Sequence, residues 1–103
     1  QLNLNGINDV IIDPGFGFGK NIKHNFTILK NLNELSILNK PILVGLSRKS
    51  MVYKTLNTSA LRSINGTVAL NVLALENGAK ILRVHDIKEA EECIKLTSIL
   101  PFK

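Results

Sequence analysis

The chain has 103 residues, which sets an upper limit of one domain. Hydrophobic residues make up 45% of it, a share typical of a globular chain rather than a disordered one. Aromatic residues make up 5% and tryptophan is absent, which argues against a platform that stacks the bases of single-stranded nucleic acid. The net charge is +5, but the lysines are scattered, so we expect most of them on the solvated surface. A polyanion-binding patch is the less favoured alternative, and a local anionic ligand stays open.

The single cysteine, Cys93, excludes an internal disulfide, and its place on the apolar side of a predicted helix indicates a small buried hydrophobe. This is consistent with a reducing cytoplasm. No apolar run approaches the ~20 residues of a membrane-spanning helix. Because the sequence starts at Gln1 and first reads like the end of an earlier element, we expect a fragment of a longer chain.

Strands and helices alternate along the chain. In chain order, the pattern predicts a strand over 9–13, a helix over 22–38, a strand over 42–46, a short helix over 50–56, a loop over 58–62, a helix over 63–77, a strand over 80–85 and a last helix after 86. We expect Asn21 to cap the first helix and Gly78 to end the helix over 63–77. Asp86 and Glu89 predict a capping box at the last helix. The helix over 63–77 is apolar on most of its surface, so we expect neighbours on more than one side of it.

The three predicted strands are near-continuous apolar runs, which indicates a parallel sheet buried on both faces. Two α/β architectures suit this order: a doubly wound sheet, or part of a (β/α)8 TIM barrel. Each strand–helix unit takes about 35 residues, so the chain holds three units where a barrel needs eight. In both architectures the functional groups lie at the carboxyl ends of the strands.

The first strand ends in Asp13, and a loop with glycine at every second position follows. A carboxylate there can accept hydrogen bonds from an amidine-like edge of a heterocycle, or it can cap a turn before Pro14. The loop does not match the dinucleotide fingerprint, which requires glycine where Lys20 stands, nor the Walker pattern. Phe16 and Phe18 alternate with the glycines, so we expect at least one ring to be exposed towards a ligand, with packing of the loop as the alternative.

The other two strands end in basic and polar residues. If the second strand extends that far, Ser47 and Lys49 point to one side, and Lys49 supplies a positive charge; a solvated turn is equally consistent with this segment. Arg83 and His85 share a side at the end of the third strand. Because placing two donor groups there is costly without an anion, we expect an anion site, with an ion pair inside the fold as the alternative.

Four segments together resemble the C-terminal part of the dihydropteroate synthase family of pterin-binding barrels. They are Asp13-Pro14-Gly15-Phe16-Gly17-Phe18-Gly19-Lys20, Gly45-Leu46-Ser47-Arg48-Lys49-Ser50-Met51, Gly66-Thr67 and Arg83-Val84-His85-Asp86. The resemblance implies that residues 1–103 are the sixth to eighth strand–helix units of one (β/α)8 domain. It also implies a transferase of folate biosynthesis, which condenses dihydropterin hydroxymethyl diphosphate with p-aminobenzoate and releases diphosphate.

The resemblance assigns the pterin ring to Asp13 and Lys49, and the diphosphate to Arg83 and His85. Lys49, Arg83 and His85 are then the catalytic residues. No protein nucleophile is required, because the amine of p-aminobenzoate attacks while the cations stabilise the leaving group. Phe18, Lys49 and Ser50 are implied to bind p-aminobenzoate, and sulfonamides are the implied inhibitors. The resemblance leaves the role of Arg48 open.

The segment before Gly66 departs from the family pattern, since it contains Arg62 one place early and no Glu, which puts a contact of the 58–66 loop in doubt. The family's magnesium ligand belongs to earlier strands, so we expect Mg²⁺ as a cofactor but no metal ligand in this chain. The resemblance also implies a cytoplasmic homodimer, and we expect this chain alone to be inactive and unstable. Two alternatives remain: the pterin-binding domain of a corrinoid methyltransferase, and a regulatory domain that binds nucleic acid.

Overall fold

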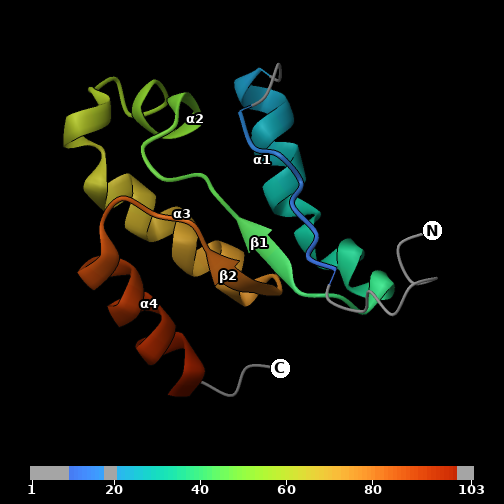
Figure 1. The fold of residues 1–103 in the computed structure, drawn as a ribbon. Helices are drawn as coiled ribbons and strands as arrows, with labels where there is room; N and C mark the ends of the chain where they lie inside the picture. The colour runs from blue at the N-terminus through green and yellow to red at the C-terminus, as the bar shows by residue number, and fades with distance from the viewer. Residues whose placement is uncertain (1–9, 18–20, 100–103) are drawn as a thin grey trace.

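The computed structural model describes residues 10–17 and 21–99 and has an α/β fold (Figure 1). Its elements, in chain order, are α1 (Ile22–Lys30), the 3-10 helix η1 (Leu32–Leu38), β1 (Ile42–Val44), α2 (Ser50–Tyr53), the 3-10 helix η2 (Ala60–Arg62), α3 (Ile64–Glu76), β2 (Ala79–Leu82) and α4 (Ile87–Ile99). β1 and β2 lie side by side, and α4 lies along α3 (Figure 1). The alternation of strands and helices predicted from the sequence is confirmed.

The strands are parallel, as predicted. Val44 of β1 pairs with Leu82 of β2, and the ladder continues one bond further, because the Arg83 N–H donates to the Val44 carbonyl at 2.9 Å. On the other side of β1, Ile12 forms a parallel bridge to Ile42. The carboxyl ends of three chain segments therefore meet at one edge, which is where the predicted site residues follow.

The first strand is shorter than predicted. Asp9 lies outside the described residues, and of the rest only Ile12 pairs with a neighbour. The chain turns at once after it, because the Asp13 carboxylate accepts a hydrogen bond from the Gly15 N–H at 2.9 Å, and Gly15 takes a positive φ of 74°. The local turn thus ends the pairing that the apolar run favoured.

The helix predicted over 22–38 is in fact two helices. Its N-cap is confirmed, since Asn21 Oδ1 accepts from the His24 N–H at 2.8 Å, but the α-helix ends at Lys30 and a 3-10 helix follows from Leu32. Asn31 lies at the break, and asparagine is a poor residue for a helix interior. The predicted end at Gly78 is confirmed: Asn77 is the C-cap of α3 and Gly78 has a φ of 107°.

The predicted strands over 42–46 and 80–85 and the helix over 50–56 are also shorter, since β1 ends at Val44, β2 ends at Leu82 and α2 ends at Tyr53. The predicted loop over 58–62 contains η2, whose first turn closes when Ser59 Oγ accepts from the Arg62 N–H. None of the helices in the described part of the chain combines the length and hydropathy needed to cross a membrane.

The core is formed by apolar side chains from β1, the adjoining loops and the helices around them. Its largest fully enclosed side chains include Phe16, Leu32, Ile42, Leu46 and Met51. Phe16 is 1% exposed, so this ring packs the Gly-rich loop onto the core. Phe18 lies outside the described residues, so exposure of at least one of the two rings stays a prediction. Cys93 is buried as predicted, and burial raises the pKa of its thiol.

The buried face of α3 is more polar than predicted. Its enclosed residues are Thr67, Asn71 and Ala74, whereas Leu73 is about half exposed. Asn71 is 2% exposed, and its Oδ1 has no hydrogen-bond partner among the described residues. An enclosed amide oxygen that lost its water without gaining a donor destabilises the fold.

Replacing this amide with an apolar side chain of similar volume should therefore stabilise the protein. We expect Asn71→Leu to raise the free energy of unfolding by about 1 kcal/mol, measured by urea denaturation. Asn65→Leu, at an exposed position of the same helix, is the matched control and should change it by less than about 0.5 kcal/mol. A loss of stability in Asn71→Leu would mean that the Asn71 oxygen is satisfied in solution.

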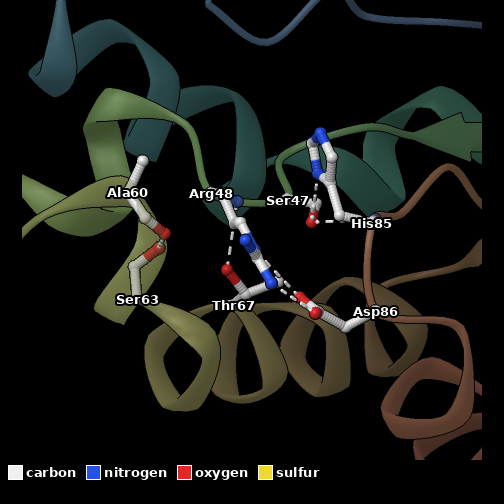
Figure 2. A network of polar contacts seen from close by, with 7 residues as sticks. All are labelled: Ser47, Arg48, Ala60, Ser63, Thr67, His85 and Asp86. Carbon is white, nitrogen blue, oxygen red and sulfur yellow. Dashed lines mark hydrogen bonds and ion pairs between the residues drawn. The ribbon is translucent and has the colours of Figure 1, made fainter.

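Arg48 ties the loop after β1 to the start of α4. Its Nε and Nη2 donate to the two carboxylate oxygens of Asp86 at 3.1 and 2.5 Å, and its backbone N–H donates to Thr67 Oγ1 at 3.1 Å (Figure 2). The capping box predicted from Asp86 and Glu89 is wrong for the described residues, because this arginine takes the Asp86 carboxylate. The hydrogen bonds from Arg48 lower the pKa of Asp86 below its usual 3.8.

This lowered pKa fixes the direction of a pH effect. The Asp86 carboxylate contributes stability above about pH 3.8, and the contribution is lost as the pH falls through its lower folded pKa. We expect the melting temperature of the wild type to fall more steeply below pH 3.8 than that of Asp86→Asn. Glu91→Gln, an exposed position of α4, should follow the wild type. Parallel acid curves for wild type and Asp86→Asn would contradict the account.

Candidate functional site

Three loops leave the same edge of the sheet and carry the polar residues predicted from the sequence. They are residues 13–17 after the Ile12 bridge, residues 45–49 after β1 and residues 83–86 after β2. They lie on neighbouring segments because the pairing is parallel and follows chain order. The predicted shared face is therefore present.

Asp13 caps the turn, as one of its two predicted roles held, and it also pairs with Arg83. One carboxylate oxygen caps the turn through the Gly15 N–H, and the other accepts from Arg83 Nη1 at 3.2 Å. The Gly15 hydrogen bond is the main cause that lowers the pKa of Asp13, and the charges of Arg83 and Lys49 add to it. Asp13 is therefore ionised at neutral pH, and it offers oxygen acceptors at the edge of the sheet.

Lys49 lies between the loop after β1 and the Gly-rich loop. Its Nζ donates to the Phe16 carbonyl at 2.6 Å, and its stem packs against the open side of Gly17, where a Cβ would meet Lys49 Cδ at 3.2 Å. Partial burial lowers the pKa of Lys49, and the positive charge of Arg83 lowers it further. Two cations thus act on one another at this edge, which favours the binding of an anion.

Arg83 reaches the sheet edge across the backbone of Gly45. A Cβ at Gly45 would stand 2.5 Å from Arg83 Nη2 and 2.8 Å from its Cζ, so only glycine leaves room for the guanidinium in this position. Half of the Arg83 side chain is exposed, and its ion pair with Asp13 is open to solvent. An ion pair inside the fold was the alternative predicted for Arg83, and the structure shows such a pair with Asp13. Because a solvent-exposed ion pair is weak, this one can open when a ligand binds.

His85 contacts the loop after β1. Ser47 is 4% exposed, and its Oγ lies 3.0 Å from His85 Nδ1 and accepts from the His85 N–H at 3.3 Å (Figure 2). The strand does not extend far enough for Ser47 and Lys49 to point to one side, because β1 ends at Val44 and Arg48 has a positive φ of 56°. Ser47 thus contacts His85, whereas Lys49 contacts Phe16. Arg83 and His85 likewise have different partners.

A cavity of about 440 Å³ opens beside Lys49. Ser50, the first residue of α2, lines it together with Phe16, Gly17 and Tyr53. The cavity is therefore lined by two of the residues predicted to bind p-aminobenzoate, Lys49 and Ser50. Phe18, the third, lies outside the described residues. Tyr53 was not predicted, although its position three residues after Ser50 on a helix would have put it on the same face.

Gly66 and Thr67 support the site from the first turn of α3. A Cβ at Gly66 would stand 2.7 Å from Val52 Cγ1, so this glycine lets α2 approach α3 closely. Thr67 accepts the Arg48 N–H and so holds the loop between Ser47 and Lys49. In the sequence the pair stands out only as part of a motif, because its contacts connect residues far apart in the chain.

No group of three or more His, Cys, Asp or Glu side chains within residues 10–17 and 21–99 is arranged to hold a metal ion. These residues do not fit a Mg²⁺ site, and no chemical step is assigned to a metal here.

Comparison with known proteins identifies the family. The family described as "Pterin binding enzyme" matches residues 1–85. A dihydropteroate synthase of Escherichia coli is 46% identical over 87 residues, which cover 84% of this chain and 31% of that protein. A bifunctional dihydropteroate synthase/dihydropteroate reductase of Helicobacter pylori is 41% identical over 87% of this chain and 24% of that protein.

Solved structures give the same result. A Yersinia pestis dihydropteroate synthase in a sulfonamide drug complex has a TM-score of 0.88 and 47% identity, over 91% of this chain and 35% of that one. A Thermus thermophilus dihydropteroate synthase in complex with 4-aminobenzoate has a TM-score of 0.85 and 38% identity, over 92% and 39%. The chain thus spans about a third of the length of the relatives it matches. With the family pattern matched over most of its length, the chain belongs to the pterin-binding enzyme family.

Proposed function

We propose that the protein is a dihydropteroate synthase of folate biosynthesis, which joins a dihydropterin hydroxymethyl diphosphate to p-aminobenzoate and releases diphosphate. Residues 1–103 are the sixth to eighth strand–helix units of one (β/α)8 domain. The family match and the relatives support this assignment. The observation that carries it is the gathering of Asp13, Lys49 and Arg83 at one edge of the sheet.

Asp13 and Lys49 bind the pterin in this proposal. The ionised Asp13 accepts hydrogen bonds from the amino-pyrimidine edge, whose N–H groups match two carboxylate oxygens. One of these oxygens pairs with Arg83 in the absence of substrate, so binding exchanges an ion pair for a substrate contact. Lys49, already 2.6 Å from the Phe16 carbonyl, donates to the ring from the opposite loop.

Arg83 and His85 bind the diphosphate. The bond between the pterin methylene carbon and the diphosphate oxygen breaks, and the oxygen gains negative charge as it does so. A guanidinium and an imidazole N–H stabilise that charge more in the transition state than in the substrate, which lowers the barrier. The neutral amine of p-aminobenzoate supplies the electron pair for the new bond to the methylene carbon and then releases a proton to solvent. Lys49 orients the amine, and no protein nucleophile is needed.

The cavity beside Lys49 binds p-aminobenzoate. Ser50 can donate its hydroxyl to the substrate carboxylate, and Lys49 borders both substrates. Phe18 lines the same pocket in this proposal. Sulfonamides, which share the ring and amine of p-aminobenzoate, bind there too; the relatives with 4-aminobenzoate and with a sulfonamide drug support this.

The remaining features of the proposal concern the whole protein. Mg²⁺ is its cofactor and is bound by residues outside this chain, and the reaction takes place in the cytoplasm. Residues 1–103 alone have no synthase activity, since the relatives are about three times as long. The whole protein is a homodimer that packs through its late helices. Exposed apolar side chains on α3 and α4 support this: Leu73, Ile94, Leu96 and Ile99.

The decisive test measures diphosphate binding by the intact protein. Arg83→Ala should weaken binding of inorganic diphosphate at least tenfold and lower kcat/KM for the pterin substrate by a similar factor, because a charge-assisted hydrogen bond is lost. Gly45→Ala should also weaken diphosphate binding, although it keeps the charge of Arg83, since a Cβ at residue 45 displaces the guanidinium. Lys88→Ala removes an exposed cation of α4 and serves as the control.

Equal diphosphate affinity in the wild type and Arg83→Ala would overturn the assignment of Arg83. A wild type that binds a pterin but no diphosphate would favour the corrinoid methyltransferase alternative, in which no diphosphate leaves. Binding of nucleic acid that weakens with salt would favour the regulatory alternative.

A further inference from the structure

His85 is held through one ring nitrogen by a buried hydroxyl. Ser47 Oγ lies 3.0 Å from His85 Nδ1, while the His85 side chain itself is exposed. The other ring nitrogen, Nε2, is at the far end of the ring from Ser47 (Figure 2). The direction of the hydrogen bond between Ser47 and Nδ1 therefore decides what His85 offers to a ligand.

The second contact of Ser47 bears on that direction. The backbone N–H of His85 can only donate, so Ser47 Oγ accepts from it at 3.3 Å. If Nδ1 also carried a proton, Ser47 would accept twice, and its own proton would need another acceptor. Among the described residues, the hydrogen-bond partners of the Ser47 hydroxyl are the N–H and Nδ1 of His85. With the Ser47 proton donated to Nδ1, a neutral ring carries its own proton on Nε2.

We propose that Ser47 is a positioning residue, which fixes His85 as the Nε2–H tautomer and holds that N–H outward as a donor to the diphosphate oxygen. The identity of the anion rests on the proposed function, whereas the tautomer of His85 does not depend on it. A histidine that presented an unprotonated nitrogen would repel the leaving group, whereas an N–H stabilises it. Ser47 touches no reacting atom and acts through His85.

The neighbouring pair keeps the two loops at the distance that this contact needs. Ser47 contacts His85, and the next residues along both loops, Arg48 and Asp86, form the ion pair described above (Figure 2). Arg48 is anchored in turn to Thr67 of α3. Two successive cross-links between the loops restrain both translation and rotation of the ring, which a single hydrogen bond would not do.

Nitrogen-15 NMR of the His85 ring tests the tautomer without reference to activity. In the intact protein, at a pH where the ring is neutral, we expect a protonated Nε2 and an unprotonated, hydrogen-bonded Nδ1, with the signals assigned by their loss in His85→Gln. Ser47→Ala should give a mixture of tautomers, while Ser36→Ala, an exposed serine at the other end of the sheet, should leave the spectrum unchanged. A protonated Nδ1 in the wild type, observable whether or not any variant folds, would overturn the proposal.

Titration with inorganic diphosphate tests the consequence. Ser47→Ala should weaken binding about tenfold, and Ser47→Cys, which fills nearly the same space with a weak donor, should resemble Ser47→Ala rather than the wild type. Wild-type affinity in both variants, with Arg83→Ala still impaired, would overturn the role of Ser47 but leave the proposed function intact. Absence of diphosphate binding in the wild type would instead count against the proposed function.

Discussion

The pairing of the loops after β1 and β2 is the interaction on which the site depends. The strands themselves are three and four residues long, too short to orient side chains well beyond their ends. The bond from the Arg83 N–H to the Val44 carbonyl extends the ladder by one step. Beyond it, the contacts of Ser47 with His85 and of Arg48 with Asp86 hold the two loops together. Without these bonds, Lys49 and Arg83 would have no fixed relation to one another.

Charge is the second constraint on this edge. Burial and then the charge of Arg83 lower the pKa of Lys49, and the opposite charge of Asp13 offsets this only in part. Such an arrangement costs folding free energy, which a protein tolerates where a ligand of opposite charge binds. The substrate that we propose, a diphosphate ester with a hydrogen-bonding ring, has an anionic end for the cations and a ring edge for the carboxylate.

Local sequence signals predicted the features that depend on neighbouring residues. The cap at Asn21, the helix end at Gly78 and the order of parallel strands all follow from residue type and spacing within a few positions. The turn at Asp13 was among the interpretations offered. The shared edge was also predictable, because parallel strands place their carboxyl ends together whatever the details of the loops.

Features that depend on distant residues were missed or wrong. The capping box at Asp86 fails because an arginine 38 positions earlier takes its carboxylate, and no local pattern reveals that partner. The enclosed Thr67 on α3 has the same origin, since it accepts a hydrogen bond from the Arg48 N–H. The positive φ of Arg48, which separates Ser47 from Lys49, is likewise set by these contacts rather than by the preference of arginine.

The central claim is that the three loops form one ligand-binding edge, and amide chemical-shift mapping tests it most directly. On addition of inorganic diphosphate and then a pterin to the intact protein, we expect shifts in all three loops, at residues 13–17, 45–49 and 83–86. Shifts confined to one of these loops, or centred on the opposite edge around Asn39, Lys40 and Gly78, would contradict the account.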